Sequence, residues 1–396
     1  MHVRPDPRTS HALKHDLGAA LERLASVRTR RALRRDPIYR QLEPEIVRIT
    51  DGCEWDLRPT LERPPGRDRL GVVAWNVERG KRIDGVLAVM SEHERLRNAD
   101  LYLMTEVDIG VGRSGNRNVA RELAEHLGCG YVYCNMDLLL SPGDAFERDH
   151  EDPNALALHG CALLTRWPVT RFECVPLIEY RDKFHDHEKR LGGKRALVCE
   201  VQLPDGPVTV AVTHLDPFSP PRHRGRQMRR ILRAVRRMGH HRAIVGGDWN
   251  TNTYDLGTSW GLCANVAHKL VRFGFAGTIE QYMRPEAVFE RHTFAALEEA
   301  GFEIDPYNAR ELGTAYYDLN DPELDDWTRR YIPGFAHRWL RKQLEPWNHC
   351  VPLRIDWIAG RGLQPIDPAV IHRPQHEGRP VSDHDPVLVD LINQRR

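Results

Sequence analysis

The sequence predicts an α/β protein in which β-sheets pack on each other and helices flank them. Three observations support this prediction. Apolar runs typical of buried strands recur along the chain, as in "DLYLMTEV" and "HRAIVGGDWN". The stretch "KRALVCEVQLPDGPVTVAVTHL" is expected to form a long hairpin that turns at residues 204–206. Few helices alternate strictly with strands, which favours a sheet-on-sheet core.

The first 69 residues are expected to form a helical extension and a linker. Residues 11–35 repeat leucine at helical spacing, and Pro37 is expected to end this helix. "LERPPGRDR" is typical of a linker, and the strand "LGVVAW" opens a main domain over residues 70–396. Within that domain, residues 251–350 predict a helical insertion rich in aromatic residues.

Two further stretches predict amphipathic helices. "NRNVARELAEHLG" places Val119, Leu123 and Leu127 on one face, with Gly128 positioned to end the helix. Residues 222–237, "RHRGRQMRRILRAVRR", place arginines on one face and apolar residues on the other. We interpret the basic face as the solvated side of a structural helix; a surface for nucleic-acid phosphates is the weaker alternative.

Composition narrows the class of protein. The 396 residues carry a formal net charge of +1, so no global field favours nucleic acid. Eight cysteines without a Cys-x-x-Cys pair favour free thiols over a disulfide frame or a zinc site. The N-terminus lacks the apolar core of a secretory signal, and no apolar run is long enough to span a bilayer. We therefore expect a cytoplasmic protein without a transmembrane segment, of unknown oligomeric state.

Polar residues at predicted strand ends carry the chemistry. Five apolar stretches are expected to finish in such a residue, namely Asn76, Glu106, His214, Asp248 with Asn250, and Asp356; the acidic cluster Asp383-His384-Asp385 precedes its strand. Each stretch alone is typical of a turn or a cap. Strand ends that meet at one sheet edge would gather these groups in a cleft, where buried carboxylates require a cation or a proton. The oxygen donors suit Mg²⁺ or Mn²⁺ better than zinc.

The ordered set of motifs, above all "GGDWN" with "SDHDP", resembles the endonuclease/exonuclease/phosphatase superfamily over roughly residues 70–391, apart from the insertion. The resemblance implies a four-layer α/β sandwich, in which two mixed sheets are flanked by helices. It also implies Mg²⁺- or Mn²⁺-dependent hydrolysis of phosphate esters. Thr105 stands where family members usually carry Gln, so we expect altered support for Glu106 without loss of the metal.

The resemblance implies that three residues serve the metal. Glu106 is similar to the main metal-binding carboxylate of the family. Asn76 would orient it or the phosphate, and so contribute to both metal binding and catalysis. Asp383 would complete the metal region. Asp385 is expected only to shape the turn before the last strand.

Five residues would perform the hydrolysis itself, again by resemblance. Asp248, helped by Asn250, would position or deprotonate the attacking water. His214 would contact the phosphate or assist the leaving group. His384, oriented by Asp356, would contact the phosphoryl oxygens. An aspartate bonded to His384 is expected to raise the pKa of the imidazole and fix its tautomer.

Two polar loops supply candidate substrate contacts. Arg113 and Asn116 follow the Glu106 strand in "DIGVGRSGNRNVA", and Arg190 and Arg195 lie in or beside "EYRDKFHDHEKRLGGKR". The alternative for the first loop is a flexible strand-to-helix turn capped by Ser114 or Asn116, and the alternative for the second is a mobile polar loop. The sequence predicts a phosphoesterase but leaves its substrate open. A nuclease acting on DNA or RNA, a lipid or inositol-phosphate esterase, and a catalytically silent binding scaffold remain alternatives.

Overall fold

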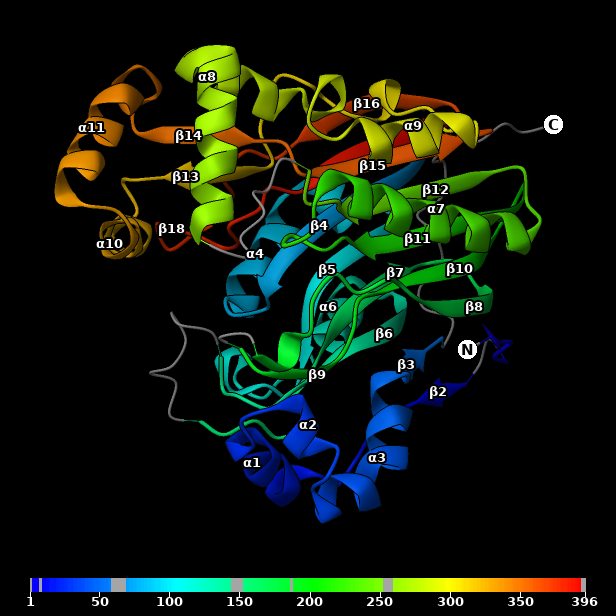
Figure 1. Cartoon of the computed structure of the whole chain (residues 1–396). Helices are drawn as coiled ribbons and strands as arrows, with labels where there is room; N and C mark the ends of the chain where they lie inside the picture. Colours follow the sequence, from blue (N-terminus) through cyan, green and yellow to red (C-terminus); the bar gives the residue numbers. More distant parts are fainter. Residues whose placement is uncertain are drawn as a thin grey trace.

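Two β-sheets pack face to face, and helices cover the outer face of each (Figure 1). This computed structural model describes residues 2–6, 9–57, 69–143, 152–185, 188–251 and 259–392. All but the last residue of the predicted linker lies outside the described residues. The layers run helix, sheet, sheet, helix, and thereby confirm the predicted four-layer α/β sandwich.

The larger sheet has nine strands and places two parallel strands, β4 and β5, at its centre. Its strands, in spatial order, are β16 (Pro365–Val370), β19 (Val387–Ile392), β4 (Arg69–Arg79), β5 (Leu101–Ile109), β7 (Leu158–Thr165), β6 (Gly130–Leu139), β3 (Cys53–Asp56) and β2 (Ser10–His11), with β9 (Arg190–Gly192) paired to β6. Because β19 is antiparallel to β4, the start of β19 lies beside the end of β4.

The smaller sheet has six strands, of which β11 and β12 run parallel. Its strands, in spatial order, are β1 (His2–Val3), β8 (Val169–Pro176), β10 (Arg195–Leu203), β11 (Gly206–His214), β12 (Ala243–Asp248) and β15 (Asp356–Arg361). The predicted hairpin is confirmed, since Leu203 of β10 pairs with Gly206 of β11.

The helices divide into three groups. On the six-stranded sheet lie α7 (Pro221–Met238) and α9 (Arg291–Glu299). On the nine-stranded side lie α1 (Gly18–Ser26), α2 (Arg30–Leu33), α3 (Pro37–Thr50), α4 (Ile83–Glu92), α5 (Glu94–Arg97) and α6 (Val119–Leu127).

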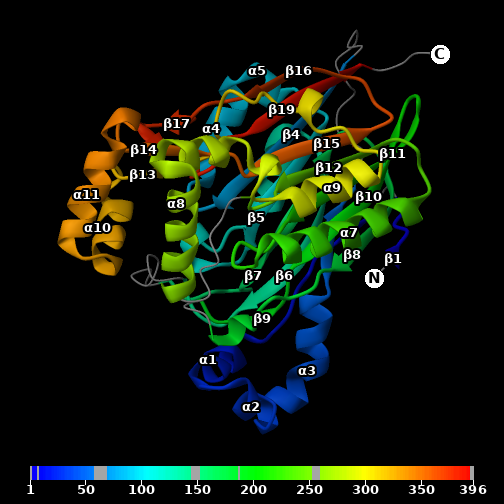
Figure 2. The ribbon, with the colours of Figure 1, turned by 45° about the horizontal axis from the view of Figure 1, so that its top comes forward.

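The third group comes from the predicted insertion. Its helices α8 (Ser259–Met283), α10 (Pro322–Tyr331) and α11 (Gly334–Leu344) surround the strand pair β13 (Ala315–Asp318) and β14 (Cys350–Leu353). Figure 2 shows this third group beside the sheets. A short pair, β17 (Gln375–His376) and β18 (Arg379–Pro380), precedes β19.

Alternation along the strands fills the layers between the sheets and helices. On β4, Val73 and Trp75 face the helices, whereas Val72 and Ala74 face the six-stranded sheet. This period of two is what a strand buried on both faces requires. Both predicted amphipathic helices are present as α6 and α7, and the left-handed Gly128 ends α6 as expected.

The predicted N-terminal helix over residues 11–35 is wrong. Residues 10–11 form a strand, α1 begins only at Gly18, and Pro37 starts α3 instead of ending a helix. The Asp36 carboxylate caps α3 by accepting the backbone N–H groups of Ile38 (2.8 Å) and Tyr39 (3.2 Å). Proline suits the first helical position, where its missing N–H costs nothing. The segment before residue 57 also gives strands to both sheets.

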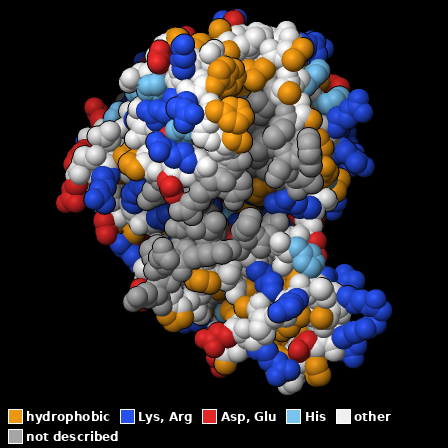
Figure 3. Space-filling view, turned by 60° about the vertical axis from the view of Figure 1, so that its left-hand side comes forward, with side chains coloured by type: hydrophobic (Ala, Val, Ile, Leu, Met, Phe, Trp, Pro, Cys, Tyr) orange, Lys and Arg blue, Asp and Glu red, His pale blue; other side chains and the backbone are white. Residues whose placement is uncertain are grey.

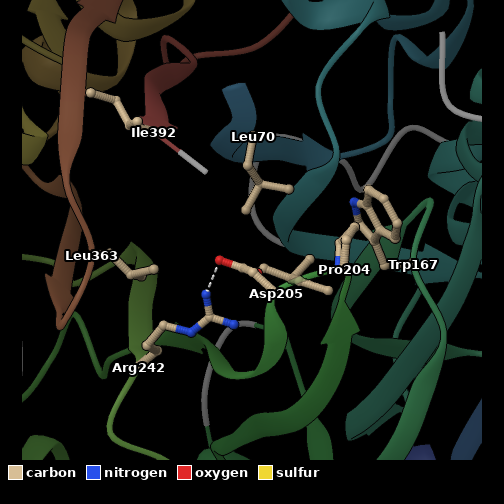
Figure 4. A pocket seen from close by; sticks show the side chains of 8 residues that line it. Leu70, Trp167, Pro204, Asp205, Arg242, Leu363 and Ile392 are labelled. Atoms are coloured by element: carbon tan, nitrogen blue, oxygen red, sulfur yellow. Dashed lines mark hydrogen bonds and ion pairs between the residues drawn. The ribbon is translucent and has the colours of Figure 1, made fainter. Parts of the chain in front are cut away.

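The two ends of the sandwich differ. At the end where β4 and β12 begin, Arg242 pairs with Asp205 across a crevice of about 10 Å³ (Figure 4). That volume holds about one water molecule and no larger ligand. The opposite end carries the polar residues singled out in the sequence. Within the ranges given above, none of the helices combines the length and apolar character needed to cross a bilayer.

Candidate active site

Strand direction brings the predicted residues to one edge. Glu106 on β5, His214 at the end of β11 and Asp248 at the end of β12 lie at the carboxyl ends of parallel pairs. We expected Asp356 to end its strand, and this is wrong: β15 begins at Asp356. Because β15 is antiparallel to β12, Asp356 still lies directly opposite Asp248. A residue at the start of an antiparallel strand therefore reaches the same sheet edge as a residue at the end of the neighbouring strand.

Bulges in β4 and β5 aim side chains into this edge. The register shifts between Asn76 and Arg79 on β4, and the register of β5 against β7 shifts between Met104 and Val107. Within these shifts Arg79 (φ 66°) and Glu106 (φ 52°) adopt left-handed backbone. Such conformations cost about 1–3 kcal/mol each and persist where the surrounding structure enforces them.

Glu106 faces two basic groups. Arg79 Nε lies 3.4 Å from Glu106 Oε2, and His214 Nε2 lies 3.8 Å from Oε1. Burial opposes ionisation of this carboxyl, but the Arg79 guanidinium holds its pKa well below the ordinary value. About 20% of the side chain remains exposed, so the carboxylate is not sealed from solvent.

Asp248 is held in place from three directions. Its Oδ1 accepts the backbone N–H of Asn250 (2.8 Å), and its Oδ2 accepts the Asn76 amide (3.2 Å) and lies 3.5 Å from His214 Nε2. Asn250 in turn donates its amide to the Leu215 carbonyl (2.9 Å). Burial and the facing Asp356 raise the pKa of Asp248.

The close packing of β12 against β11 explains why the second residue of "GGDWN", Gly247, is a glycine. Gly247 has φ 124°, a conformation that favours glycine, and a Cβ there would run into the Thr213 carbonyl on β11. The missing side chain lets β12 lie close to β11, and this close approach sets His214 beside Asp248.

His384 and Asp356 form the tightest contact of the edge. His384 Nδ1 lies 2.7 Å from Asp356 Oδ2, and both side chains are buried. Burial opposes protonation of the imidazole, yet Asp356 and Asp383 raise the pKa of His384 well above its ordinary value. His384 is therefore an imidazolium between carboxylates, as the sequence led us to expect of an aspartate-bonded histidine.

His214 has the opposite electrostatic character. Burial and the neighbouring Lys194 ammonium lower the pKa of His214 well below its ordinary value, although Glu106 opposes the shift. The two histidines of the edge thus differ in charge: His214 is neutral and His384 is protonated.

Several buried polar atoms at the edge have no hydrogen-bond partner within the described part of the chain. They are Thr105 Oγ1, His214 Nδ1 and Asp356 Oδ1. The Thr105 hydroxyl gives Glu106 no hydrogen bond, so the support for Glu106 comes from Arg79 and His214 instead. Unpaired polar atoms are costly in a core and are typical of a site that binds something.

Asp383, the residue before His384, is exposed to solvent. Its negative charge affects Glu78 on β4: burial and Asp383 together raise the pKa of Glu78. Ser382 holds the turn by donating its hydroxyl to the Asn76 carbonyl (2.8 Å) and by accepting the His384 N–H (3.1 Å).

The expected supporting role of Asp385 agrees with its contacts. Its carboxylate accepts the Tyr316 hydroxyl (2.9 Å) and the Arg373 N–H (2.8 Å), and its own N–H donates to the Thr314 carbonyl (2.7 Å). These bonds fix the turn before β19 and do not face Asp248.

The substrate-contact prediction fails for Arg113. Its side chain is completely buried and donates to Asp108 (2.7 Å) and Glu188 (2.5 Å), so it has no surface to offer a ligand. The polar Gly-rich loop suggested access to the cleft, but the nearby carboxylates draw the guanidinium inward.

The other three candidates are engaged in their own surroundings. Arg190 pairs with Glu188 and with Asp137 (3.2 Å), and Arg195 pairs with Asp51. The Asn116 side chain is exposed; its amide donates to the Pro153 carbonyl (3.0 Å) and its oxygen accepts the Ala155 N–H (2.9 Å). Among the described residues, no hydrogen bond joins these three to the edge that carries Glu106 and Asp248.

Sequence reasoning missed two residues that hold the site. Arg79 follows Asn76 within "WNVER", and its place in that motif was the available signal. Thr314 comes from the insertion, and its hydroxyl accepts the N–H groups of Ile355 (3.1 Å) and Asp356 (3.0 Å). Nothing in its local sequence marks it, because its partners are more than forty positions away.

Comparisons with known proteins identify the family to which the chain belongs. The sequence model of the Endonuclease/Exonuclease/phosphatase family matches residues 73–384. Searching the curated proteins returned no match. Solved structures with a similar fold include an endonuclease/exonuclease/phosphatase from Beutenbergia cavernae DSM 12333 (17% identity, TM-score 0.46, covering 82% of this chain and 72% of that one). Others are the Bacteroides vulgatus protein of the same description (14%, 0.46, 82% and 98%) and the human Nocturnin catalytic domain with bound sulfate (15%, 0.46, 82% and 95%). Since the family match spans most of its length, the chain belongs to the endonuclease/exonuclease/phosphatase family.

Proposed function

We propose that this protein is a Mg²⁺- or Mn²⁺-dependent phosphoesterase that hydrolyses a phosphodiester or phosphomonoester by in-line attack of water. Family membership supports phosphoesterase activity in general terms. The observation that carries the finer proposal is the meeting of three buried groups, Asp248, Asp356 and His384, whose ligand atoms lie within 4.8 Å of one another. Glu106 and His214 adjoin them.

This compact group has the spacing of a metal site, but we assign the cation elsewhere. His384 Nδ1 is already engaged with Asp356 Oδ2 at 2.7 Å, which leaves neither of these two atoms free for a cation. We therefore assign the group to proton and phosphate chemistry.

The oxygen donors that fit a divalent cation lie beside it. Glu106 is charged and partly exposed, and Asp383 is exposed. The amide oxygen of Asn76 accepts the Glu78 N–H (3.0 Å), and its second lone pair would serve the cation. Carboxylate and amide oxygens are what Mg²⁺ and Mn²⁺ prefer. When bound, the ion would supply charge neutralisation at the phosphoryl oxygens.

The chain's own residues divide the remaining work. Asp248, whose orientation Asn76 and Asn250 fix, would position the attacking water and accept its proton, for which its raised pKa is suited. His384, protonated and held by Asp356, would contact the phosphoryl oxygens as charge develops on them. His214 would donate a hydrogen bond to the phosphate or the leaving oxygen.

Hydrolysis of an aryl phosphodiester with Mg²⁺ or Mn²⁺ tests this proposal. Wild type should turn over, and Glu106→Gln and Asp248→Asn should lose about 10²- to 10⁴-fold in kcat/KM, the usual contribution of such groups. Asp390→Asn on β19 is a matched control, because it also removes one carboxylate but lies at the far end of its strand, opposite Gly71. Wild type no faster than Asp248→Asn with every metal tested would favour the silent scaffold over the enzyme.

A further inference from the structure

A short arginine-rich segment carries a charge that the rest of the chain lacks. Residues 23–40 contain seven arginines and one aspartate, which gives +6, whereas all 396 residues together carry +1. We call this segment the arginine patch. It spans the end of α1, all of α2 and the start of α3. Six of its arginines are exposed: Arg23, Arg28, Arg31, Arg34, Arg35 and Arg40.

Little within the fold compensates this charge. Within the described part of the chain, the ion pairs of the patch are Arg23 with Asp36 (3.5 Å) and Arg30 with Asp182 (2.6 Å). Asp36 is also committed to capping α3. Arg31, Arg34 and Arg35 stand at i, i+3 and i+4 on and beside the four-residue α2, where like charges destabilise a helix. The arrangement works against local stability, as a surface built for a polyanion does.

The shape and chemistry of the patch fit phosphates rather than a lipid surface. Thr29, Arg31, Ala32, Arg35 and Asp36 line an open, shallow hollow of about 550 Å³. Figure 3 shows Lys and Arg side chains gathered on the lower part of the molecule, where the N-terminal helices lie. No large apolar side chain is exposed among residues 23–40, all of which the structure describes, so the patch offers nothing to insert into a bilayer. Guanidinium groups bind phosphate oxygens in pairs.

A loop connects the patch to an exposed aromatic ring. Arg30 of α2 holds Asp182 by two bonds, Nη2 to Oδ1 (2.6 Å) and Nε to Oδ2 (3.0 Å). Two residues earlier, Tyr180 has a relative exposure of 43%, and its ring contacts only the edge of His223 (centroids 5.4 Å apart) among the described aromatic contacts. An exposed ring beside a basic surface is the arrangement on which unpaired bases stack.

The same loop reaches the candidate active site. The Ile178 carbonyl accepts Nε2 of Gln227 (2.8 Å), and Gln227 Oε1 accepts the backbone N–H of Asp216 (3.1 Å). Asp216 follows His214 by two residues. Arg30 of the patch is thus linked to the His214 segment through the 178–182 loop, Gln227 of α7 and Asp216.

We propose that the arginine patch and Tyr180 form a docking surface for single-stranded nucleic acid, which leads a strand toward the Glu106–Asp248 edge. The arginines bind the backbone phosphates, and Tyr180 stacks on a base. The proposal rests on the proposed function only in that the docked strand supplies the phosphodiester to be hydrolysed. It names the substrate class that the edge residues alone leave open.

Binding is measured without catalysis. Fluorescence anisotropy of a labelled 20-nucleotide poly-dT, in EDTA and at 50 and 200 mM salt, gives Kd and its salt dependence for the full chain. Arg31→Gln/Arg34→Gln/Arg35→Gln should weaken binding at least tenfold at 50 mM salt. It should also flatten the slope of log Kd against log salt by about 2, since each single-strand phosphate contact contributes about 0.7. All three positions are exposed, so circular dichroism should be unchanged.

A second basic surface provides the matched control. Arg230→Gln/Arg233→Gln/Arg236→Gln on α7 also removes three exposed charges, and should change Kd less than threefold. Equal losses in both triple variants would overturn the proposal, because binding would then follow total charge and not the patch.

Tyr180 separates stacking from charge. Tyr180→Ala should weaken poly-dT binding about 5- to 100-fold, as the loss of one stacked base does. Tyr180→Trp should bind poly-dT about as tightly as the wild type does, because its ring also stacks on a base. A merely structural role for the tyrosine ring would not allow this. Unchanged binding in Tyr180→Ala, tighter binding of a 20-base-pair duplex, or binding only to phosphatidylserine vesicles would each overturn the proposal. Aryl phosphodiester hydrolysis by the same wild-type preparation reports separately on the proposed function.

Discussion

Two buried charged clusters begin two residues apart on β5 and differ in how their charges are matched. The acid–histidine cluster consists of Glu106, His214, Asp248, Asp356 and His384. The arginine-paired cluster consists of Asp108, Arg113, Asp137, Glu188 and Arg190. In the second cluster every carboxylate has a guanidinium within 3.2 Å. In the first cluster two carboxylates face each other across paired strands.

The difference separates structural charges from charges that await a ligand. Arg113 satisfies Asp108 and Glu188 at once, and it thereby closes the loop after β5. Each cluster keeps one buried carboxylate oxygen without a hydrogen-bond partner among the described residues, Oδ1 of Asp356 and Oδ1 of Asp137. The difference lies in the charges: burial and Asp356 raise the pKa of Asp248, whereas at Asp137 burial is outweighed by Lys183 and Arg190, which lower its pKa. A short distance from Glu106 is therefore a poor guide to whether a charged residue is functional. Whether its charge is balanced by a neighbouring opposite charge separates structural from functional residues better.

The largest expected effect comes from breaking the acid–histidine cluster at Asp248. Asp248→Asn should lower kcat/KM for an aryl phosphodiester by about 10²- to 10⁴-fold. Stability should be unchanged or higher, because the variant removes a carboxylate that repels Asp356. Urea unfolding in EDTA beside the kinetic assay checks both. A variant that loses activity and stability together would place Asp248 among the structural charges.

Breaking the arginine-paired cluster should lower the stability of the fold, whereas Asp248→Asn lowers activity. Asp108→Asn removes the charge of the carboxylate that the fully buried Arg113 contacts twice, through Nε (2.7 Å) and Nη2 (3.2 Å), and should cost about 3–5 kcal/mol in the free energy of unfolding. Urea unfolding measures this loss. Asp367→Asn is the matched control, since it removes the partner of Arg69 in an exposed pair, worth about 1 kcal/mol or less. Equal costs for the two variants would contradict the comparison.

The sequence predicts the location of the acid–histidine cluster better than it predicts the residues that hold the cluster in place. Apolar runs that finish in His214 and Asp248 suffice, because parallel strands end at a common edge. Asp356 belongs there for a different reason, the antiparallel start of β15, which a strand pattern alone does not reveal. Partners such as Thr314 depend on which distant segments meet, and no local signal encodes that.

Side-chain direction was harder to predict than strand position. Arg113 lies on the expected loop, but Asp108 and Glu188, five and seventy-five positions away, turn its guanidinium inward. Pro37 misled for a related reason: a proline ends one helix or begins the next, and only the capping of α3 by Asp36 decides between them. The sequence thus predicted which segments carry the strands and helices better than it predicted the polar contacts that set where Arg113 points and where α3 begins.

The two histidines of the acid–histidine cluster sharpen the comparison through pH. The pKa of His384 in the folded state lies well above 6.5, so its contribution to stability is complete below pH 6.5 and is lost as pH rises through the folded pKa. Because the pKa of His214 is lowered, its contribution has the opposite sign: it is present above pH 6.5 and lost as pH falls. The two imidazoles therefore stabilise the fold in opposite ranges of pH.

Unfolding by urea in EDTA, measured from pH 5 to pH 10, tests both signs. The cost of His384→Gln should be greatest at low pH and shrink as pH rises. The cost of His214→Gln should be smallest at low pH. A difference between wild type and His384→Gln that stays flat across this range would show that the Asp356–His384 contact holds no proton.

Thr105 gives the smallest expected effect and the finest test of which polar atoms at this edge await a ligand. Its hydroxyl is buried and has no partner among the described residues, and it stands beside Glu106. If the hydroxyl contacts neither ligand nor protein, Thr105→Val keeps the shape and should stabilise the fold by about 1 kcal/mol, with kcat/KM changed less than threefold. If it hydrogen-bonds a bound ion's water or the phosphate, the same variant should lower kcat/KM tenfold or more at unchanged stability. The second result would place Thr105 with Asp356 among the groups that await a ligand, and the first would place it with the core.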